Sequence, residues 1–413
     1  MNVYGSCGSL FIAASLFITN IFFIFLSLFG MEYNGKETEG PIFIITVLGI
    51  NCIAILFILN YERKYHLYAQ GKIWPYWIPF IYFSFYALEL FMGMVDSGSR
   101  AEDVMRDFIA VSLVGIWGGT FCYRCCKFKE IVEYIELLLF VSTIALLLAL
   151  PTMFLKSIGV TIGGAGDHQI VSYIAAVSLG FTICRLRFKP NFGLLFFNSP
   201  FYRYISPFVA LIQAFICLVG GGRGGFVLLI VIMTTIILYS IKDILKLIII
   251  GLVIIILIIF LFNVISPTLE DTNIMRAFSI FAKSGEDVDS IRSSIYKITT
   301  NYIYDAPLFG HGIFFQYNWC QKILTQPYCH NLFLEILLQG GIMYLIIWLI
   351  VFLRFFIKVH YLIKIDPVYS FLIPLVAYSF VMLMFSGTYL LTPLFWFVII
   401  FVLGTKNIKT YKR

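Results

Sequence analysis

Long apolar runs alternate with short polar connections along almost the whole chain. An apolar run of about 17–25 residues has the length that crosses a bilayer as a helix. The pattern therefore predicts an all-α integral membrane protein with about twelve transmembrane helices. The predicted spans are residues 8–30, 41–60, 73–95, 107–123, 132–155, 169–184, 204–221, 226–241, 246–266, 332–353, 367–387 and 389–404.

One connection is much longer than the others. Residues 267–331 form the longest polar stretch of the chain, between the ninth and tenth predicted spans. Connections beyond about 12–15 residues are usually functional or disordered, and the aromatic residues in this one predict an ordered loop over the membrane surface. The chain then divides into residues 1–266 with nine helices, the loop 267–331, and residues 332–413 with three helices and a basic tail.

Composition supports this class. Hydrophobic residues make up 61% of the chain and charged residues 12%, whereas soluble domains average about 25% charged residues. The first apolar run is too long for the core of a signal peptide and has no basic residue before it, so we expect a retained helix. Nine cysteines in so apolar a chain do not indicate a disulfide framework.

Basic residues predict the orientation of the helices. Lys and Arg favour cytoplasmic connections, and a cytoplasmic N-terminus puts 19 of the 29 Lys and Arg residues on that side. Both termini are then cytoplasmic, and the loop 267–331 is external. The net charge of +7 follows mainly from this asymmetry, with some contact to anionic lipid, and needs no nucleic acid to explain it.

Three of the five histidines fall on the external side. His168 follows a glycine-rich stretch, His311 lies in a predicted turn over residues 307–312, and His330 comes just before an apolar run. The start of a helix favours an anion, and a neutral imidazole can accept a proton from a hydroxyl. Alternatively, His330 and Asn331 only cap the helix.

Two external arginines are candidates for binding phosphate. Arg223 lies in the glycine-rich segment 220–225, where the backbone can approach a ligand and the guanidinium matches phosphate oxygens. A tight hairpin with one interfacial arginine explains the same residues equally well. Arg292 lies in a predicted amphipathic helix that runs from Asp289 to the turn at Pro307, and a solvated charge is the simpler interpretation there.

Two acids within apolar runs and several cysteines have either a structural interpretation or one that the sequence leaves open. Glu89 and Glu335 lie within apolar runs, where a carboxylate is costly and marks a candidate site. Cys320 and Cys329 are both predicted to be external, and the sequence does not decide whether they pair. We expect neither a metal nor another cofactor. Another group of cysteines consists of Cys122, Cys125 and Cys126. It lacks the second pair of ligands that a zinc site needs.

A motif around His330 links these candidates. His330-Asn331, then nine residues, Gly341, two residues and Tyr344 resemble the histidine motif of the O-antigen ligase and polymerase superfamily. The hairpin at Arg223 resembles the first external arginine of that family. The segment from Arg292 through the turn at His311 resembles its second arginine and the Pro–Gly turn that follows. The run from His330 to Leu338 resembles the polymerase (Wzy) branch more than the ligase (WaaL) branch.

The resemblance implies a GT-C-like fold and a substrate, an oligosaccharide carried on undecaprenyl diphosphate. Arg223 and Arg292 would bind the diphosphate, and His330 would accept a proton from, or orient, the attacking sugar hydroxyl. The implied site faces the periplasm in the bacterial inner membrane, and a chain-length-determining membrane protein is a candidate partner. Supporting roles would fall to Asn331, His311, Gly341 and Tyr344.

Two other functions compete with a polymerase of repeat units. A ligase would use a similar site to pass a finished glycan to lipid A core. A transporter or flippase of lipid-linked glycans belongs to another class, which usually shows repeated halves and several charges within the membrane. Here the polar residues gather in one external loop, and no strong repeat is visible.

Overall fold

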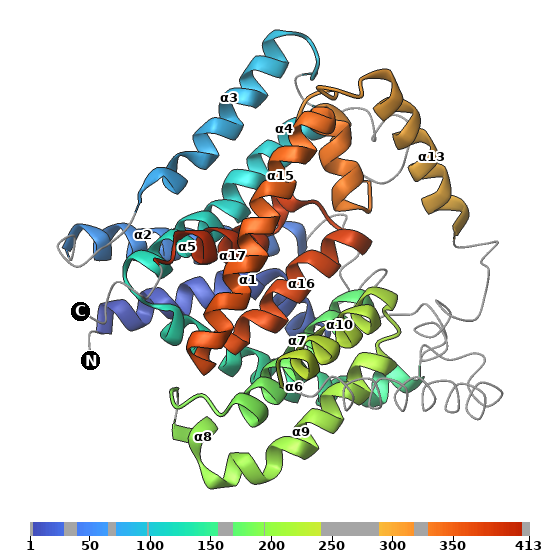
Figure 1. The fold of residues 1–413 in the computed structure, drawn as a ribbon. Helices are drawn as coiled ribbons and strands as arrows, with labels where there is room; N and C mark the ends of the chain where they lie inside the picture. The colour runs from blue at the N-terminus through green and yellow to red at the C-terminus, as the bar shows by residue number, and fades with distance from the viewer. Residues whose placement is uncertain are drawn as a thin grey trace.

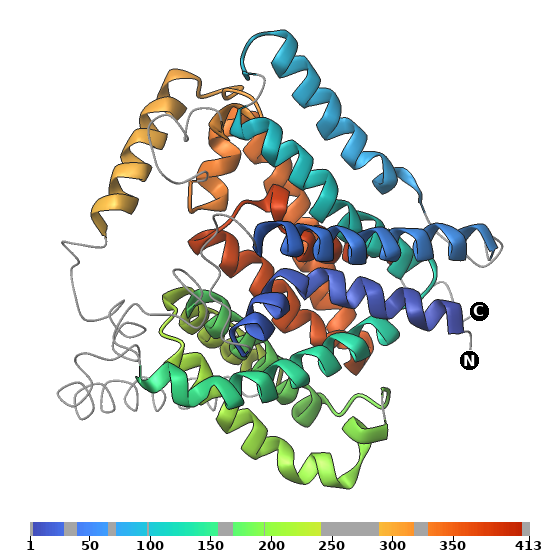
Figure 2. The same ribbon diagram turned by 180° about the vertical axis from the view of Figure 1, so that it is seen from behind.

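The computed structural model describes residues 3–28, 39–64, 72–96, 99–155, 168–193, 195–240, 289–317 and 329–406. Within these residues every regular element is a helix, which confirms the predicted all-α class (Figures 1 and 2). In the same part of the chain, eight helices are long and apolar enough to cross a membrane, accompanied by two shorter apolar helices. The protein is therefore a multi-pass membrane protein.

The helices follow the predicted spans closely. The predicted span 246–266 lies outside the described residues, and every other predicted span overlaps a helix. The N-terminal half contains α1 (Val3–Leu28), α2 (Glu39–Lys64), η1 (Trp74–Trp77), α3 (Ile78–Phe91), α4 (Arg100–Asp107), the π-helical turn η2 (Phe108–Ser112), α5 (Leu113–Arg124), α6 (Phe128–Leu155) and α7 (His168–Phe188). The C-terminal half contains α8 (Leu195–Asn198), α9 (Pro200–Val219), α10 (Arg223–Ser240), α13 (Asp289–Asp305), α15 (Leu332–Ile365), η4 (Pro367–Phe371), α16 (Leu372–Phe385), η5 (Tyr389–Leu391) and α17 (Pro393–Gly404).

Small residues allow the central helices to pack closely. Helix α17 lies against α5, where a Cβ atom on Gly115 would stand only 2.1 Å from the carbonyl oxygen of Pro393. A Cβ atom on Gly119 would stand 2.8 Å from the carbonyl oxygen of Phe397. Helix association in membranes depends on such close approach, because lipid offers no hydrophobic advantage to the contact. Helix α3 lies apart at the edge of the bundle (Figure 1).

Basic side chains join several helices at one end of the bundle. There, Arg124 pairs with Glu62 at 2.9 Å, Lys129 pairs with Asp366 at 3.7 Å, and Arg187 donates to the carbonyl oxygen of Ser240. These contacts join the ends of α2, α5, α7, α10 and α15 with the start of α6. The start of α10 and the end of α16 lie at the opposite end. The orientation of the two ends relative to the cell remains the prediction made from the basic residues.

Helix α15 folds back on itself. The rings of Phe333 and Phe352 are 6.4 Å apart, whereas a straight helix would separate those residues by about 28 Å. The reversal occurs at Gly340 and Gly341, whose backbone angles are not helical, and Figure 1 shows the two orange arms that meet there. The predicted span 332–353 is therefore correct as helix but wrong as one straight crossing.

The turn 307–312 supplies the hydrogen bonds that the bend in α15 lacks. The amides of His311 and Gly312 donate to the carbonyl oxygens of Leu338 and Gln339, at 2.9 and 2.8 Å. In return, the amides of Ile342 and Met343 donate to the carbonyl oxygens of Pro307 and Leu308, at 2.8 and 3.2 Å. Irregular backbone within a membrane protein persists only where protein or water satisfies its polar groups. The turn meets that need here.

Candidate active site

His330 is held by its imidazole and by its backbone. Its Nδ1 atom lies 2.9 Å from the carbonyl oxygen of Phe385, the last residue of α16. A carbonyl oxygen can only accept a hydrogen bond, so in the neutral ring the proton sits on Nδ1 and Nε2 carries the lone pair. The backbone of His330 has a φ of +54°, which is uncommon outside glycine and typical of a functional constraint.

Asn331 is the N-cap of α15. Its Oδ1 atom accepts from the amides of Phe333 and Leu334, at 3.0 and 3.3 Å. The capping interpretation is therefore confirmed for Asn331. It does not explain His330, which precedes the cap and points its ring at α16. The cap fixes the position of the histidine relative to the first arm of α15.

Helix α13 contacts the segment around His330. The helix confirms the one predicted between Asp289 and Pro307. The hydroxyl of Tyr296 donates to the carbonyl oxygen of His330 at 3.3 Å, and Thr299 donates to the sulfur of Cys329 at 3.8 Å. Arg292 lies four residues before Tyr296, and residues with that spacing share one face of a helix. Position 292 is therefore one turn away from the contact with His330.

Arg223 is the first residue of α10, and the glycines beside it serve packing. Cβ atoms on Gly224 and Gly225 would stand 2.0 Å from the hydroxyl of Tyr173 and 2.3 Å from Cβ of Ser172. The α9–α10 hairpin therefore presses against α7, as the tight-hairpin interpretation expects. Arg223 itself is half-buried, and within the described residues no hydrogen bond or ion pair engages its side chain. Its guanidinium remains available to an anion.

The start of α10 comes level with the end of α16. A Cβ atom on Gly180 of α7 would touch both Pro374 of α16 and Ile232 of α10, at 2.7 and 3.0 Å. These two residues therefore lie at the same level along the axis of the bundle. Arg223 lies nine residues before Ile232, and Phe385 eleven residues after Pro374. Because these two helices run in opposite directions, Arg223 and the carbonyl that holds His330 lie at the same end.

The remaining predicted site residues build the bend in α15 and do not surround His330. The imidazole of His311 donates through Nε2 to the carbonyl oxygen of Tyr302 at 2.7 Å and stacks on Phe315. Gly341, at a φ of +62°, faces the backbone of Leu308, where a Cβ atom would approach to 2.4 Å. The hydroxyl of Tyr344 lies 3.2 Å from that of Tyr389. These residues support the site through the bend in α15 and do not line it.

Glu335 is the centre of a buried polar network. Its Oε1 atom accepts from Gln316 and Tyr317 at 3.0 Å each, from Gln339 at 3.4 Å, and from Thr388. The side chain is 1% exposed. A carboxylate in an apolar environment is tolerated when hydrogen bonds satisfy it. Glu335 therefore joins the first arm of α15 to residues 316–317 and to the α16–α17 connection.

A chain of hydroxyl groups extends this network across the bend. Tyr389 donates to Oε1 of Gln339 at 2.6 Å. A hydroxyl has one proton to give, so Tyr344 must donate to Tyr389, and Tyr82 must donate to Tyr344 across 3.0 Å. The chain therefore orients every hydroxyl towards Gln339 and Glu335. The sequence could not reveal it, because its members are far apart in the chain.

Glu89 holds the backbone at residues 313–314. Its carboxylate accepts from the amides of Ile313 and Phe314, at 2.6 and 2.9 Å. The two acidic residues found within apolar runs thus accept hydrogen bonds from nearby parts of one segment. Glu89 accepts from residues 313 and 314, and Glu335 accepts from residues 316 and 317. Their positions fit structural roles. Phe385 and Tyr296 both contact His330, and neither stood in a motif.

Two other predictions concern cysteines and metals. Cys329 is buried beside Thr299 and Gln316, whereas Cys320 lies outside the described residues, so their pairing stays open. His168 begins α7. Among the residues that the structure describes, no group of three or more His, Cys, Asp or Glu side chains could hold a metal ion.

A family model described as O-antigen ligase matches residues 208–349. The match runs from within α9 to beyond the bend in α15, about a third of the chain, and includes Arg223, Arg292 and His330. Residues 208–349 are thus similar to the O-antigen ligase family. No curated protein and no solved structure matched the chain significantly. The match indicates a ligase-like or polymerase-like function and gives no support to the flippase alternative.

Proposed function

We propose that this protein is a polysaccharide polymerase of the O-antigen ligase and polymerase superfamily. It would join undecaprenyl-diphosphate-linked oligosaccharide repeat units into O-antigen or a related surface polysaccharide. The observation that carries the proposal is the hydrogen bond between Nδ1 of His330 and the carbonyl oxygen of Phe385. It leaves the lone pair on Nε2, which is the form of histidine that a general base requires.

The reaction exchanges one bond at an anomeric carbon for another. The hydroxyl oxygen of one lipid-linked unit attacks the anomeric carbon of a second unit, and its proton passes to Nε2 of His330. The bond between that carbon and the diphosphate oxygen breaks, and undecaprenyl diphosphate leaves with the electron pair. Arg223 and Arg292 stabilise the negative charge that develops on the leaving group. The half-buried Arg223 supports this role through its unengaged guanidinium.

The donor already carries the energy of the reaction in the bond between its anomeric carbon and the diphosphate. Neither a nucleotide sugar nor a metal is needed, because the arginines supply the positive charge. The concentration of basic residues at the other end of the bundle favours a periplasmic site, with both termini in the cytoplasm of a bacterial cell. A chain-length-determining membrane protein is the proposed partner during elongation.

A ligase is the second candidate, and the description of the matching family model favours it. The two reactions differ in the acceptor alone. The run His330-Asn331-Leu332-Phe333-Leu334-Glu335-Ile336-Leu337-Leu338 resembles the polymerase branch more closely, so we place the polymerase first.

Lipopolysaccharide from a strain without the gene separates the candidates on a gel. Loss of a polymerase leaves lipid A core with a single repeat unit, whereas loss of a ligase leaves bare core. With purified protein and a lipid-linked repeat unit alone, we expect a ladder of longer lipid-linked glycans. Products that form only after lipid A core is added would show that the protein is a ligase and not a polymerase. No new glycosidic bond under either condition would contradict both.

A further inference from the structure

The carbonyl group that holds the ring of His330 belongs to the end of a helix. Phe385 is the last residue of α16, and the last four carbonyl groups of a helix have no partner within it. The next two residues leave the helix, because Ser386 is extended and Gly387 has a φ of +84°. The direction of the Phe385 carbonyl therefore depends on the connection from α16 to α17, and not on the hydrogen bonds of α16.

Packing holds the first residues of this connection loosely. Ser386 and Gly387 are half-buried. Among the described residues, a Cβ atom on Gly387 would meet only Cε of Met382, at 3.8 Å. Glycine also gives the backbone more freedom than any other residue. The first firmly buried residue after α16 is Thr388, whose side chain is 3% exposed.

Thr388 ties the connection to the first arm of α15. Its hydroxyl donates to Oε1 of Glu335 and accepts from the amide of Leu390 at 3.2 Å. The hydroxyl of Tyr317, which also donates to Glu335, lies 2.7 Å from that of Thr388. One buried hydroxyl group thus fixes the position of residue 388 relative to α15.

Two hydrogen bonds link the same two segments of the chain. The first joins His330 to the carbonyl oxygen of Phe385, and both residues are half-buried. The second lies five residues further along one segment and three further along the other, and it joins Glu335 to Thr388. Water competes for the half-buried bond but not for the buried one. The buried bond therefore sets the register in which the bond to His330 can form.

We propose that Thr388 is a positioning residue for the reaction proposed above. Through Glu335 it holds the carbonyl of Phe385 against Nδ1 of His330, so that the ring proton stays on Nδ1 and the lone pair on Nε2. The hydrogen bonds of an imidazole determine which nitrogen carries the proton. This role rests on the proposed function of His330 as the base, since a histidine in the other tautomer cannot accept a proton at Nε2.

Two substitutions at position 388 isolate the hydroxyl group. Thr388→Val keeps the branched shape and loses the hydroxyl, whereas Thr388→Ser keeps the hydroxyl. In Thr388→Val the carboxylate of Glu335 still accepts hydrogen bonds, so it stays satisfied in its apolar environment. The donors that remain are Gln316, Tyr317 and Gln339.

Nitrogen NMR of the purified full-length protein tests this role without measuring activity. Isotope-labelled histidine shows which ring nitrogen carries the proton, and the signals that disappear in His330→Asn are those of His330. We expect the proton on Nδ1 in the unmodified protein and, in a large fraction of molecules, on Nε2 in Thr388→Val. Thr388→Ser should restore the proton to Nδ1.

Rates of glycan lengthening give the second measurement. Thr388→Val should lower kcat roughly 10- to 100-fold, the cost of a small misplacement of a catalytic group. KM should stay within about twofold, because the groups that bind the diphosphate are unchanged. Thr388→Ser should recover most of the rate. Thr120→Val is the control, because the buried hydroxyl of Thr120 donates only within α5, to the carbonyl oxygen of Ile116 at 2.9 Å, and its loss should change neither measurement.

Several results would overturn the role of Thr388. They are a proton that stays on Nδ1 in Thr388→Val, a tautomer that Thr388→Ser does not restore, and an equal change in Thr120→Val. If Thr388→Val does not fold, Thr388→Cys replaces the hydroxyl by a weaker donor, and an unchanged spectrum in that variant would have the same meaning. An unmodified protein that lengthens no glycan would contradict the proposed function alone, since the spectra still decide whether Thr388 sets the tautomer.

Discussion

The hydroxyl of Tyr296 donates a hydrogen bond to the carbonyl oxygen of His330, across 3.3 Å. This contact joins α13, which carries Arg292, to the residue proposed as the base. His330 is thus held from two directions, by α13 through its backbone and by Phe385 of α16 through its ring. Two distant parts of the chain determine where its Nε2 atom lies.

We expect His330→Asn to reduce glycan lengthening roughly 10²- to 10⁴-fold, the usual contribution of a general base. Asparagine tolerates positive φ and keeps a donor for the carbonyl of Phe385, but it cannot take a proton. The variant should therefore reach the membrane in normal amounts. His360→Gln is the control, because His360 contacts Tyr239 at the basic end of the bundle. Normal chain lengths in His330→Asn would remove His330 from the mechanism.

Arg223 and Arg292 should each require an arginine. Lysine keeps the charge but loses the fork that binds two phosphate oxygens at once, so Arg223→Lys should slow lengthening roughly tenfold and Arg223→Ala further. Arg292 should respond in the same way. Arg106→Lys serves as the control, because Arg106 has a side chain that is 68% exposed and pairs with Asp103. The gel ladder of lipopolysaccharide reports the result, and full-length ladders in both lysine variants would disprove bidentate binding.

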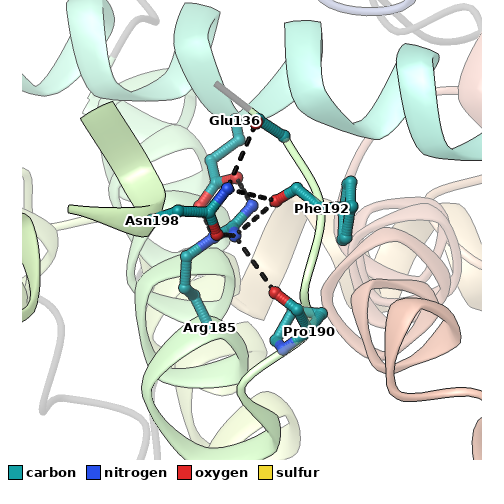
Figure 3. Close-up of polar contacts among 6 residues, drawn as sticks. Glu136, Arg185, Pro190, Phe192 and Asn198 are labelled. Atoms are coloured by element: carbon teal, nitrogen blue, oxygen red, sulfur yellow. Dashed lines mark hydrogen bonds and ion pairs between the residues drawn. The ribbon is translucent and has the colours of Figure 1, made fainter. Parts of the chain in front are cut away.

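The sequence predicted the helices, the cap at Asn331 and α13, because these depend on local periodicity and on residues close together in the chain. It did not predict the reversal of α15. Apolar residues on both sides of Gly340 and Gly341 read as one continuous span, and the hydrogen bonds that allow the reversal come from residues 307–312. The contact of His330 with Phe385 and the ion pair of Arg185 with Glu136 (Figure 3) also join distant segments. No local sequence pattern predicts either contact.

Gly341→Ala should destabilise the protein by on the order of 3 kcal/mol or more. The new Cβ atom would stand 2.4 Å from the carbonyl carbon of Leu308 and would occupy a backbone with positive φ. Gly93→Ala is a matched control, because Gly93 also has positive φ but nothing lies within 4 Å of the added atom. That control should cost only about 1 kcal/mol. Equal thermal midpoints of the two variants in detergent would show that the packed bend does not matter.

Glu335 should prove to be a structural residue. Glu335→Gln keeps an oxygen that accepts from Thr388, Tyr317 and Gln316, so we expect a stable protein that still lengthens glycans. Glu335→Leu leaves those buried donors without an acceptor and should destabilise the protein by on the order of 3 kcal/mol or more. Thermal midpoints and lengthening rates are measured together. A stable Glu335→Gln protein with no activity would instead indicate that the carboxylate takes part in the reaction.

Two neighbouring cysteines test the orientation of the chain. Cys126 is exposed in the turn between α5 and α6, at the basic end of the bundle, which we assign to the cytoplasm. Burial, together with the negative charge of Glu62, raises the pKa of the Cys125 thiol to about 12. A raised pKa means that the thiolate, which is the reactive form, is scarce at neutral pH and increases only as the pH approaches 12.

In a background with one cysteine, a membrane-impermeant maleimide should therefore label Cys126 only after the inner membrane is opened. Cys125 should stay unlabelled at neutral pH until the protein is denatured. Tyr304→Cys provides the opposite control, because Tyr304 is 76% exposed on α13 and should react in intact spheroplasts. Labelling of Cys126 in intact spheroplasts would reverse the orientation and place His330 in the cytoplasm. A periplasmic polymerase could not then use this site.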